Sequence, residues 1–232
     1  MLIAKGLAGG LFQLALFGAV LLVPAGLVPG GTWYWPRALL FLGLYGVVLG
    51  TSIVLLAAVA PASLEARLKA PASRKQPMAD RIVTTVLVLT SLGWFASIPV
   101  DVFYLKLLPK PQFVVSGFGG ALFLLGFAIV LAAIYQNSFA LPIVEDQTER
   151  GQTLVDTGLY GVVRHPLYLG MLPFLGGIAL WLGSYASLIA VSVLLIVLIA
   201  RTIVEEGVLT KTLPGYTEYM KKVRYRLVPF VW

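Results

Sequence analysis

The chain of 232 residues is too apolar and too poor in charge for a soluble domain. Hydrophobic residues make up 59% of it and charged residues 12%, whereas a soluble domain carries about 25% charged residues. It has no cysteine and one histidine, which excludes disulfides, cysteine nucleophiles, thiolate metal sites and histidine-based metal clusters. The net charge of +7 does not indicate nucleic-acid binding, because the basic residues gather in loops between apolar spans. The sequence therefore predicts an all-α polytopic membrane protein that binds neither metal nor nucleic acid.

The first region, residues 1–135, consists almost entirely of apolar spans. A membrane-spanning helix needs about 20 apolar residues, and we expect such helices over roughly 7–28, 35–60, 82–105 and 113–135. The first run follows Lys5 without a convincing small-residue cleavage site, so we expect a retained span and not a signal peptide. The segment 61–81 between the second and third spans is basic, which predicts a cytoplasmic loop.

The second region, residues 136–232, contains one apolar stretch of unusual length. Residues 166–200 are apolar except for Gly183-Ser184, and one helix of that length would measure about 52 Å. Two spans joined by a tight turn fit a bilayer better, although a single bent helix stays an alternative. The total is about six spans. With both termini in the cytoplasm, only Arg37, Lys106 and Lys110 of the 17 Lys and Arg residues lie outside, as the positive-inside rule requires.

Three polar segments of the second region lie on the predicted cytoplasmic side: 144–160, the box Arg-His-Pro-Leu-Tyr at 164–168, and 201–209, directly after the last span. Proline is favourable in the first turn of a helix, so His165-Pro166 is expected to open the fifth span. The free N–H groups there favour an anion. The alternative is that Arg164 reaches to lipid phosphates and His165 only caps the helix. Together the three segments predict a pocket between cytosol and lipid.

Ionisable residues follow at 201–206, close to the hydrocarbon, where charge is costly and usually functional. Arg201 and Glu205 are four residues apart and share one helix face, so a simple ion pair is the alternative to a functional role. Tyr160 and Tyr168 flank the box and are each also explained as interfacial tyrosines. In the tail, Tyr216, Tyr219, Val223 and Leu227 recur at helical spacing, which predicts an amphipathic helix on the membrane surface.

These segments resemble a known family. TLVDTGLYGVVRHPLYLG, RTIVEEGVL and PGYTEYMKKVRYRLVPF are similar to the isoprenylcysteine carboxyl methyltransferase family of integral membrane methyltransferases, a group that includes phospholipid N-methyltransferases. The resemblance covers about 140–232, and the N-terminal spans carry no such signature. It implies S-adenosylmethionine as the methyl donor, in a cytoplasmic-side pocket, and a lipophilic or prenylated acceptor that arrives from the bilayer.

The resemblance also implies roles for individual residues. Its cofactor loop falls on Gln152, Thr153, Leu154 and Val155, with glutamine where the family usually has histidine. Tyr160 and the box residues His165, Pro166, Leu167 and Tyr168 match further cofactor-binding positions, and Glu145 matches a polar cofactor contact by spacing only. Glu205 matches the cofactor-binding glutamate and Arg201 the substrate-facing arginine, and both are assigned here by that match.

The expected activity is methyl transfer to a lipophilic acceptor, with an isoprenylcysteine-like carboxylate as the leading substrate. A carboxylate needs no general base. If the acceptor is a lipid amine or a thiol, Glu206 is the candidate for accepting its proton. The alternatives are a membrane reductase of the sterol type, which needs a phosphate site at Arg164 or the C-terminal basic cluster, and a small transporter or assembly factor.

Overall fold

The computed structural model describes residues 1–68, 76–143, 147 and 151–232, and this part of the chain forms helices without any strand. The long helices are α1 (Leu2–Leu27), α2 (Pro36–Val59), α4 (Met78–Val100), α5 (Phe113–Gln136), α6 (Pro166–Leu182) and α7 (Tyr185–Thr212). The short ones are α3 (Pro61–Leu68), the π-helical turn η1 (Asp101–Leu105), the 3-10 turn η3 (Gly158–Gly161) and α8 (Tyr216–Lys222). The predicted all-α fold is confirmed.

Five helices of the described chain are long and apolar enough to cross a membrane: α1, α2, α4 with η1, α5 and α7. The sixth apolar helix, α6, has 17 residues and is therefore about 25 Å long. This agrees with the prediction of about six spans. The cytoplasmic location of both termini, which follows from the distribution of Lys and Arg, stays a prediction.

The last span differs from the prediction at its end. The sequence suggests that the span stops at 200 and that 201–209 follows it, whereas α7 continues as one helix to Thr212. Charge alone does not end a helix, and Arg201 and Glu206 are buried against other parts of the protein. The first proline after the apolar run is Pro214, which Gly215 follows, and α7 ends just before them.

The predicted turn within 166–200 is confirmed, and its residues explain it. Gly183 ends α6 in the left-handed conformation, with φ 95°, which glycine adopts without steric cost. Ser184 then caps α7, because its side chain accepts a hydrogen bond from the backbone N–H of Ser187. Asp101 accepts a hydrogen bond from the Ser184 hydroxyl at 2.7 Å and ties this turn to the end of α4.

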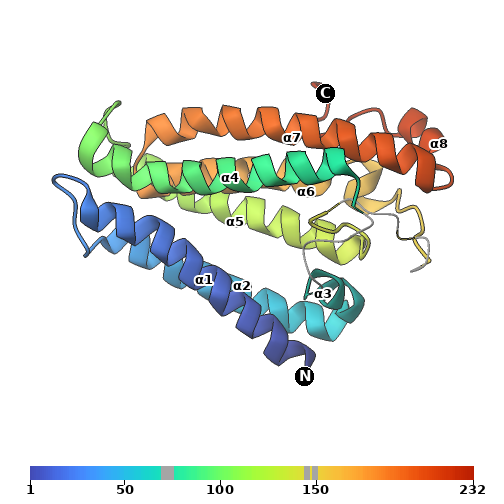
Figure 1. Ribbon diagram of the computed structural model, residues 1–232, viewed down its shortest axis with the longest axis horizontal. Helices are drawn as coiled ribbons and strands as arrows, with labels where there is room; N and C mark the ends of the chain where they lie inside the picture. The colour runs from blue at the N-terminus through green and yellow to red at the C-terminus, as the bar shows by residue number, and fades with distance from the viewer. Residues whose placement is uncertain (69–75, 144–146, 148–150) are drawn as a thin grey trace.

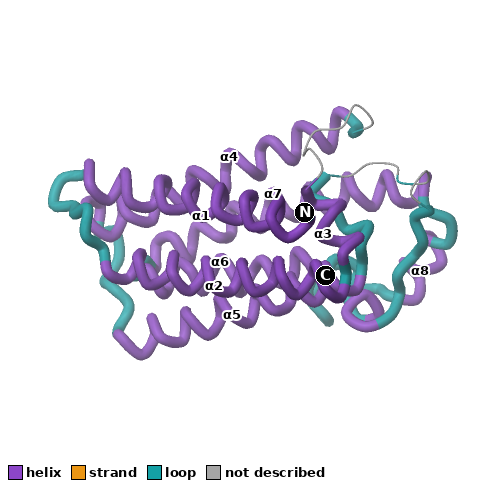
Figure 2. The backbone as a smooth tube through the Cα atoms, turned by 90° about the horizontal axis from the view of Figure 1, so that it is seen from below, coloured by secondary structure: helices purple, strands orange, loops and turns teal. Residues whose placement is uncertain are grey.

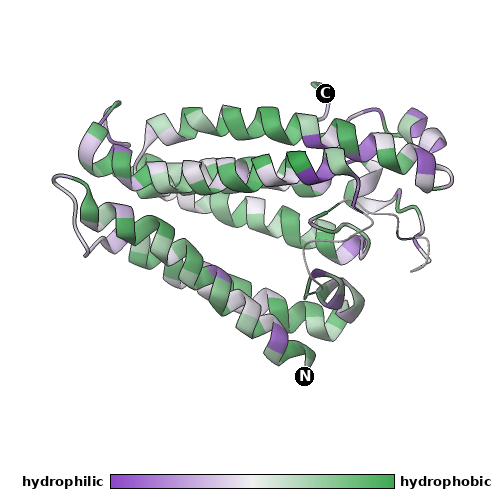
Figure 3. Ribbon diagram, viewed as in Figure 1, coloured by the Kyte–Doolittle hydropathy of each residue, from purple (hydrophilic) through white to green (hydrophobic). Residues whose placement is uncertain are grey.

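The long helices run side by side along one axis (Figure 2). Both termini lie toward the same end as α3 and α8, and the α1–α2 hairpin diverges from the other helices toward that end (Figure 1). Hydrophilic residues gather at the same end, whereas the helix shafts are mostly hydrophobic (Figure 3). The polar chemistry of the chain is thus concentrated at one end of an apolar bundle.

Helices α5 and α6 pack with their backbones in close contact, and glycine makes this possible. A Cβ atom on Gly126 would lie 2.3 Å from the backbone nitrogen of Phe174, and one on Gly177 would lie 2.3 Å from that of Phe123. Small residues allow such close approach in membrane helix pairs. The pair holds the start of α6, where the box lies, in a fixed position.

Replacing Gly126 with valine is therefore expected to force α5 and α6 apart and to lower the thermal midpoint of the detergent-purified protein by several degrees. Overpacking of this kind costs about 1–3 kcal/mol or more. The matched control is Gly117→Val in the same helix, because a Cβ there meets nothing within 4 Å. Equal midpoints for the two variants in a thermal-unfolding assay would show that the glycine contact does not matter.

Candidate functional site

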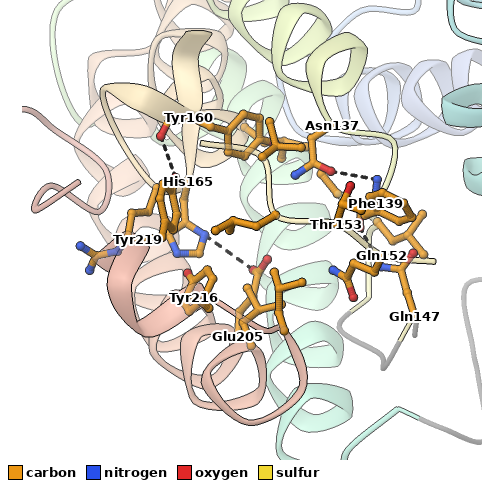
Figure 4. A pocket seen from close by; sticks show the side chains of 18 of the residues that line it. Asn137, Phe139, Gln147, Gln152, Thr153, Tyr160, His165, Glu205, Tyr216 and Tyr219 are labelled. Carbon is orange, nitrogen blue, oxygen red and sulfur yellow. Dashed lines mark hydrogen bonds and ion pairs between the residues drawn. The ribbon is translucent and has the colours of Figure 1, made fainter. Parts of the chain in front are cut away.

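A cavity lies at the polar end of the bundle, where α6 begins and α7 runs past it (Figure 4). The space between its walls, with the open mouth included, is about 780 Å³. Its walls come from the segment after α5, the loop before η3, the start of α6, the far part of α7, and α8.

Most of the residues predicted to bind a cofactor line this cavity: Gln152, Thr153, Leu154, Val155, Tyr160, His165, Leu167, Tyr168 and Glu205. Pro166, Arg201 and Glu206 do not line it in the described chain. Pro166 instead opens α6 with His165 as the N-cap residue, as predicted. Glu145 lies outside the described residues. The three predicted segments therefore meet at one cavity, and the roles of their residues stay predictions.

The loop wall of the cavity is held by hydrogen bonds of two side-chain amides. Gln147, which is buried, donates from Nε2 to the carbonyl of Phe139 at 2.8 Å. The side-chain oxygen of Asn137 accepts the backbone N–H of Phe139 at 2.9 Å. The backbone N–H of Gln152 donates to the carbonyl of Gln147 at 3.3 Å, so the segment after α5 is tied to the start of the loop 152–155.

Glu205 reaches the cavity at the end of a chain of hydrogen bonds that begins at Arg201. Nε of Arg201 donates to the Tyr168 hydroxyl at 2.7 Å, and that hydroxyl donates to Oε2 of Glu205 at 2.6 Å. The Glu205 side chain is 23% exposed, which is more than its neighbours in the site. Tyr168 therefore connects a buried cation to the one partly exposed carboxylate of the cavity wall in the described chain.

Arg201 itself is almost completely buried, with 2% of its surface exposed. It forms a salt bridge with Asp80 of α4, with Nη1 3.4 Å from Oδ1. It also donates to the hydroxyl of Thr84 and to the carbonyl of Pro142. The simple ion pair with Glu205, which was the alternative from the sequence, is replaced by an indirect connection through Tyr168, and Arg201 holds α4, α6, α7 and the cavity loop together.

Glu206 lies behind the cavity and binds three basic groups. Oε1 accepts from Nε of Arg164 at 2.7 Å and lies 3.3 Å from Nε2 of His165. Oε2 accepts from Nε of Arg226 at 2.8 Å. In the described chain this carboxylate does not line the cavity, and it holds the C-terminal tail through Arg226. The role of Glu206 as a proton acceptor stays a prediction.

The box is fixed by the tail as well as by Glu206. The backbone N–H groups of Arg164 and His165 donate to the carbonyls of Tyr225 and Arg226, both at 2.9 Å. The Arg164 guanidinium also donates to the carbonyl of Val223 at 2.7 Å. Arg164 is buried and so does not reach out to lipid phosphates, which was the alternative from the sequence.

The tail helix also differs from the prediction of a surface helix on the membrane. α8 spans only Tyr216–Lys222, and Tyr216, Tyr219 and Val223 form a buried cluster with Leu213. Leu227 belongs to another cluster, with Tyr168 and Leu198. Tyr216 and Tyr219 line the cavity, and Leu154 and Leu209 pack against their cluster, so the apolar face of α8 points into the protein.

Tyr216 supplies a polar group that has no hydrogen-bond partner among the residues that the structure describes. Its hydroxyl is buried and makes no hydrogen bond in the described chain, although the residue lines the cavity. Burial, with Glu206 and Glu205 nearby, raises the pKa of Tyr216 well above its ordinary value. The phenol therefore stays protonated, and an orphaned buried donor in a cavity wall is a position for a ligand atom.

Several residues of the wall were not predicted. Leu209 and Leu213 continue the face of Glu205 at intervals of four residues on α7, and that spacing is visible in the sequence. Asn137, Phe139, Ala140, Leu141, Ile143 and Gln147 also line the cavity. They belong to an irregular segment, and no periodic pattern marks them in the sequence.

The arrangement suits a ligand with a cationic part and an aromatic part. Glu205 offers a carboxylate that is partly exposed, and the helix N-terminus of α6 lies beside it with His165. The ring of His165 stacks on that of Tyr168, with centroids 5.6 Å apart. Phe139, Tyr160 and Tyr219 add aromatic surface to the walls. No group of three or more possible metal ligands was found among the described residues.

Comparison with known proteins supports the same region. No curated protein matches the chain significantly. The model of the phospholipid methyltransferase family matches residues 114–214, from α5 to the end of α7. The match begins earlier than the resemblance at 140–232 predicted and includes α5, one of the spans thought to carry no signature. Residues 114–214 are thus similar to the phospholipid methyltransferase family, which falls in the group of integral membrane methyltransferases that includes isoprenylcysteine carboxyl methyltransferases.

Proposed function

We propose that the protein is an S-adenosylmethionine-dependent methyltransferase of the membrane that methylates the carboxylate of a lipophilic acceptor. The observation that carries this proposal is Glu205. It is a partly exposed carboxylate, oriented by Tyr168, in a cavity lined by the residues of the family's cofactor motif.

The residues of the cavity fit the donor's groups. The α-ammonium group of the donor needs an anion, and Glu205 provides one. The carboxylate of the donor suits the side chain of His165 and the N-terminus of α6. The adenine needs flat apolar surface and a few polar contacts, for which the aromatic walls and the unpaired hydroxyl of Tyr216 are suited. When bound, S-adenosylmethionine supplies a methyl group on a positively charged sulfur.

The protein's contribution is to position the reactants and to exclude water. Methyl transfer is a direct displacement, so alignment of the reacting atoms is the main requirement. In the described part of the site, the carboxylate of Glu206 is held by three basic groups, and Glu205 accepts from Tyr168. A carboxylate acceptor needs no base, which favours it over a lipid amine or a thiol, whose proton must be removed.

The reductase alternative has less support. It needs a basic site for the additional phosphate of a nicotinamide cofactor, and Arg164 was the candidate. Arg164 is buried and engaged by Glu206 and by two backbone carbonyls of the tail. In the tail, Arg226 pairs with Glu206 and Lys222 with Asp156. For a transporter, the polar residues are at the wrong depth, since they lie at the end of the bundle and not at the midplane.

The test is calorimetric titration of the detergent-purified protein with S-adenosylhomocysteine, run beside NADPH. Saturable binding of S-adenosylhomocysteine is expected, with a loss of at least tenfold in affinity in Glu205→Gln, because the removed charge faces the donor's ammonium. Glu218→Gln is the control, since Glu218 is exposed on α8. Binding of NADPH alone would move the protein to the reductases. Binding of neither would leave it without an enzymatic assignment.

A further inference from the structure

A second cavity lies between the N-terminal hairpin and the rest of the bundle, where α1 and α2 diverge from α5 and α6 (Figure 1). It encloses about 1300 Å³ up to its open mouth. We call it the lateral chamber. Apolar residues form most of its wall, including Leu49, Ile53, Leu56, Phe127, Leu131, Ile134 and Phe174. Gly9 and Leu68 at its edge are exposed, so it opens on the outer surface of an apolar bundle.

The lateral chamber adjoins the first cavity, at the start of α6, which we call the donor cavity because we propose that it binds the methyl donor. Leu167 lines both spaces. Arg67 of α3 lines the lateral chamber, and its guanidinium donates to the carbonyl of Ala140, a residue that lines the donor cavity. A molecule in the chamber would therefore meet the donor site at the position of Arg67 and Leu167.

Arg67 is the one charged side chain among the described residues that line the chamber. Gln13 and Tyr45 hydrogen-bond to one another at 2.7 Å, and the Ser52 hydroxyl donates to its own helix. Arg67 donates only to the backbone carbonyls of Ser63 and Ala140, and no carboxylate of the described chain pairs with it. Burial lowers the pKa of Arg67 to about 10, so it is still cationic at neutral pH.

A half-buried guanidinium without an anion is unfavourable unless an anion reaches it. The fixed fork of N–H groups on arginine matches a carboxylate. Arg201, the arginine that the resemblance assigned to the substrate, is neither half-exposed nor without an anion. It is 2% exposed and already paired with Asp80.

We infer that the lateral chamber binds the apolar chain of the methyl acceptor and that Arg67 binds the carboxylate to be methylated. This inference rests on the proposed function. In the step, a carboxylate oxygen forms a bond to the methyl carbon while the bond from that carbon to sulfur breaks, and its electron pair stays on sulfur. The products are a methyl ester and S-adenosylhomocysteine, and no proton moves. The site belongs to α1, α2 and α3 as much as to the family region, which begins at 114.

A phospholipid amine is the competing acceptor, and the position of Arg67 argues against it. The group bound by Arg67 lies at the boundary of the donor cavity, so it is itself the group in reach of the methyl. A phosphate held there would direct its amine away from Arg67 by the length of the head group. This geometry therefore favours a carboxylate as the methyl acceptor.

Two variants, each with a control, separate the contribution of the Arg67 charge to acceptor binding from that of the acceptor's apolar chain. Arg67→Gln removes the cation, and Arg67→Lys keeps it as a control for the loss of packing. Gly9→Leu fills the chamber, since a Cβ there meets only Leu68 at an ordinary 3.7 Å. Gly43→Leu is its matched control, because Gly43 is exposed on α2 and a Cβ there meets nothing within 4 Å.

The assays use N-acetyl-S-farnesylcysteine as the acceptor probe, its primary amide as a competitor without charge, and phosphatidylethanolamine vesicles as the other acceptor. We expect Arg67→Gln to raise the KM for the probe about tenfold to 100-fold, because a charge-assisted hydrogen bond is lost. Arg67→Lys keeps the charge and should raise the KM less. Inhibition by the amide should be unchanged in Arg67→Gln and weakened in Gly9→Leu. Binding of S-adenosylhomocysteine should be unchanged in all four variants.

The outcomes that overturn the inference differ from those that overturn the proposed function. An unchanged KM for the probe in Arg67→Gln, or equal loss of S-adenosylhomocysteine affinity, would remove Arg67 from the acceptor site. Methylation of phosphatidylethanolamine alone, insensitive to Arg67→Gln, would leave a methyltransferase with a different acceptor. Failure of the wild type to bind S-adenosylhomocysteine would remove the proposed function itself.

Discussion

Replacing Glu206 with alanine is expected to be the most destabilising single change at the site. The side chain is 5% exposed and bridges Arg164, His165 and Arg226. Removing it leaves the buried guanidinium of Arg164 without its anion, and breaking a buried ion pair in this way costs about 3–5 kcal/mol. Because Arg164 also holds the tail at Val223 and Arg224, the tail should detach from the start of α6.

The measurement is the thermal midpoint of the detergent-purified variant, followed by limited proteolysis of the tail. A large fall in the midpoint and early cleavage after 213 are expected, with Glu218→Ala as the control on the exposed side of α8. Glu206→Gln gives the decisive comparison. If it kept a normal midpoint and normal S-adenosylhomocysteine binding but lost all turnover, Glu206 would be a proton acceptor, as the sequence suggested.

Much of the fold could be predicted from the sequence because the bilayer restricts the possible structures. Apolar runs of sufficient length had to be helices, and their bounds agree with the structure to within a few residues except at both ends of the chain. The turn at Gly183-Ser184 was predictable from length and residue type. The close pairing of α5 and α6 was not, because glycine occurs throughout these spans and only the contacts show that Gly126 lies against Gly170 and Gly177 against Gly119.

The site was predictable where a motif carried it. His165, Tyr168 and Glu205 come from three recognisable positions, and the structure brings them to one cavity. The partners of the charged residues were not predictable, because ion pairs between distant helices leave no pattern in a single sequence. Asp80 looked like part of a basic loop, yet it is fully buried and pairs with Arg201. Arg67 looked like one loop cation among several.

Neighbouring carboxylates illustrate the same limit. Glu205 and Glu206 are adjacent in sequence, and only the resemblance to a family separated their predicted roles. On α7 adjacent residues point in directions about 100° apart, so one faces the cavity and the other faces the tail. Which is which depends on the rotation of α7 against α6, and only the fold sets that.

Tyr168→Phe is expected to lower the affinity for S-adenosylhomocysteine without unfolding the protein. Its hydroxyl is the link between Arg201 and Glu205. Hydrogen bonds to charged groups contribute about 1.5–3 kcal/mol, so the loss corresponds to roughly 10-fold to 150-fold in affinity. The aromatic ring remains and still stacks on His165, so the packing of the cavity wall is preserved.

Calorimetric titration of Tyr168→Phe and of Tyr185→Phe, at the opposite end of the bundle, checks this expectation. A role in positioning Glu205 requires that Tyr168→Phe and Glu205→Gln are not additive, because each interrupts the same connection. Additive losses would mean that the Tyr168 hydroxyl binds the ligand itself. An affinity equal to that of the wild type would mean that Glu205 needs no orientation. The salt bridge of Asp80 with Arg201 and the hydrogen bond of Arg201 to Tyr168 would then serve only the packing of the helices.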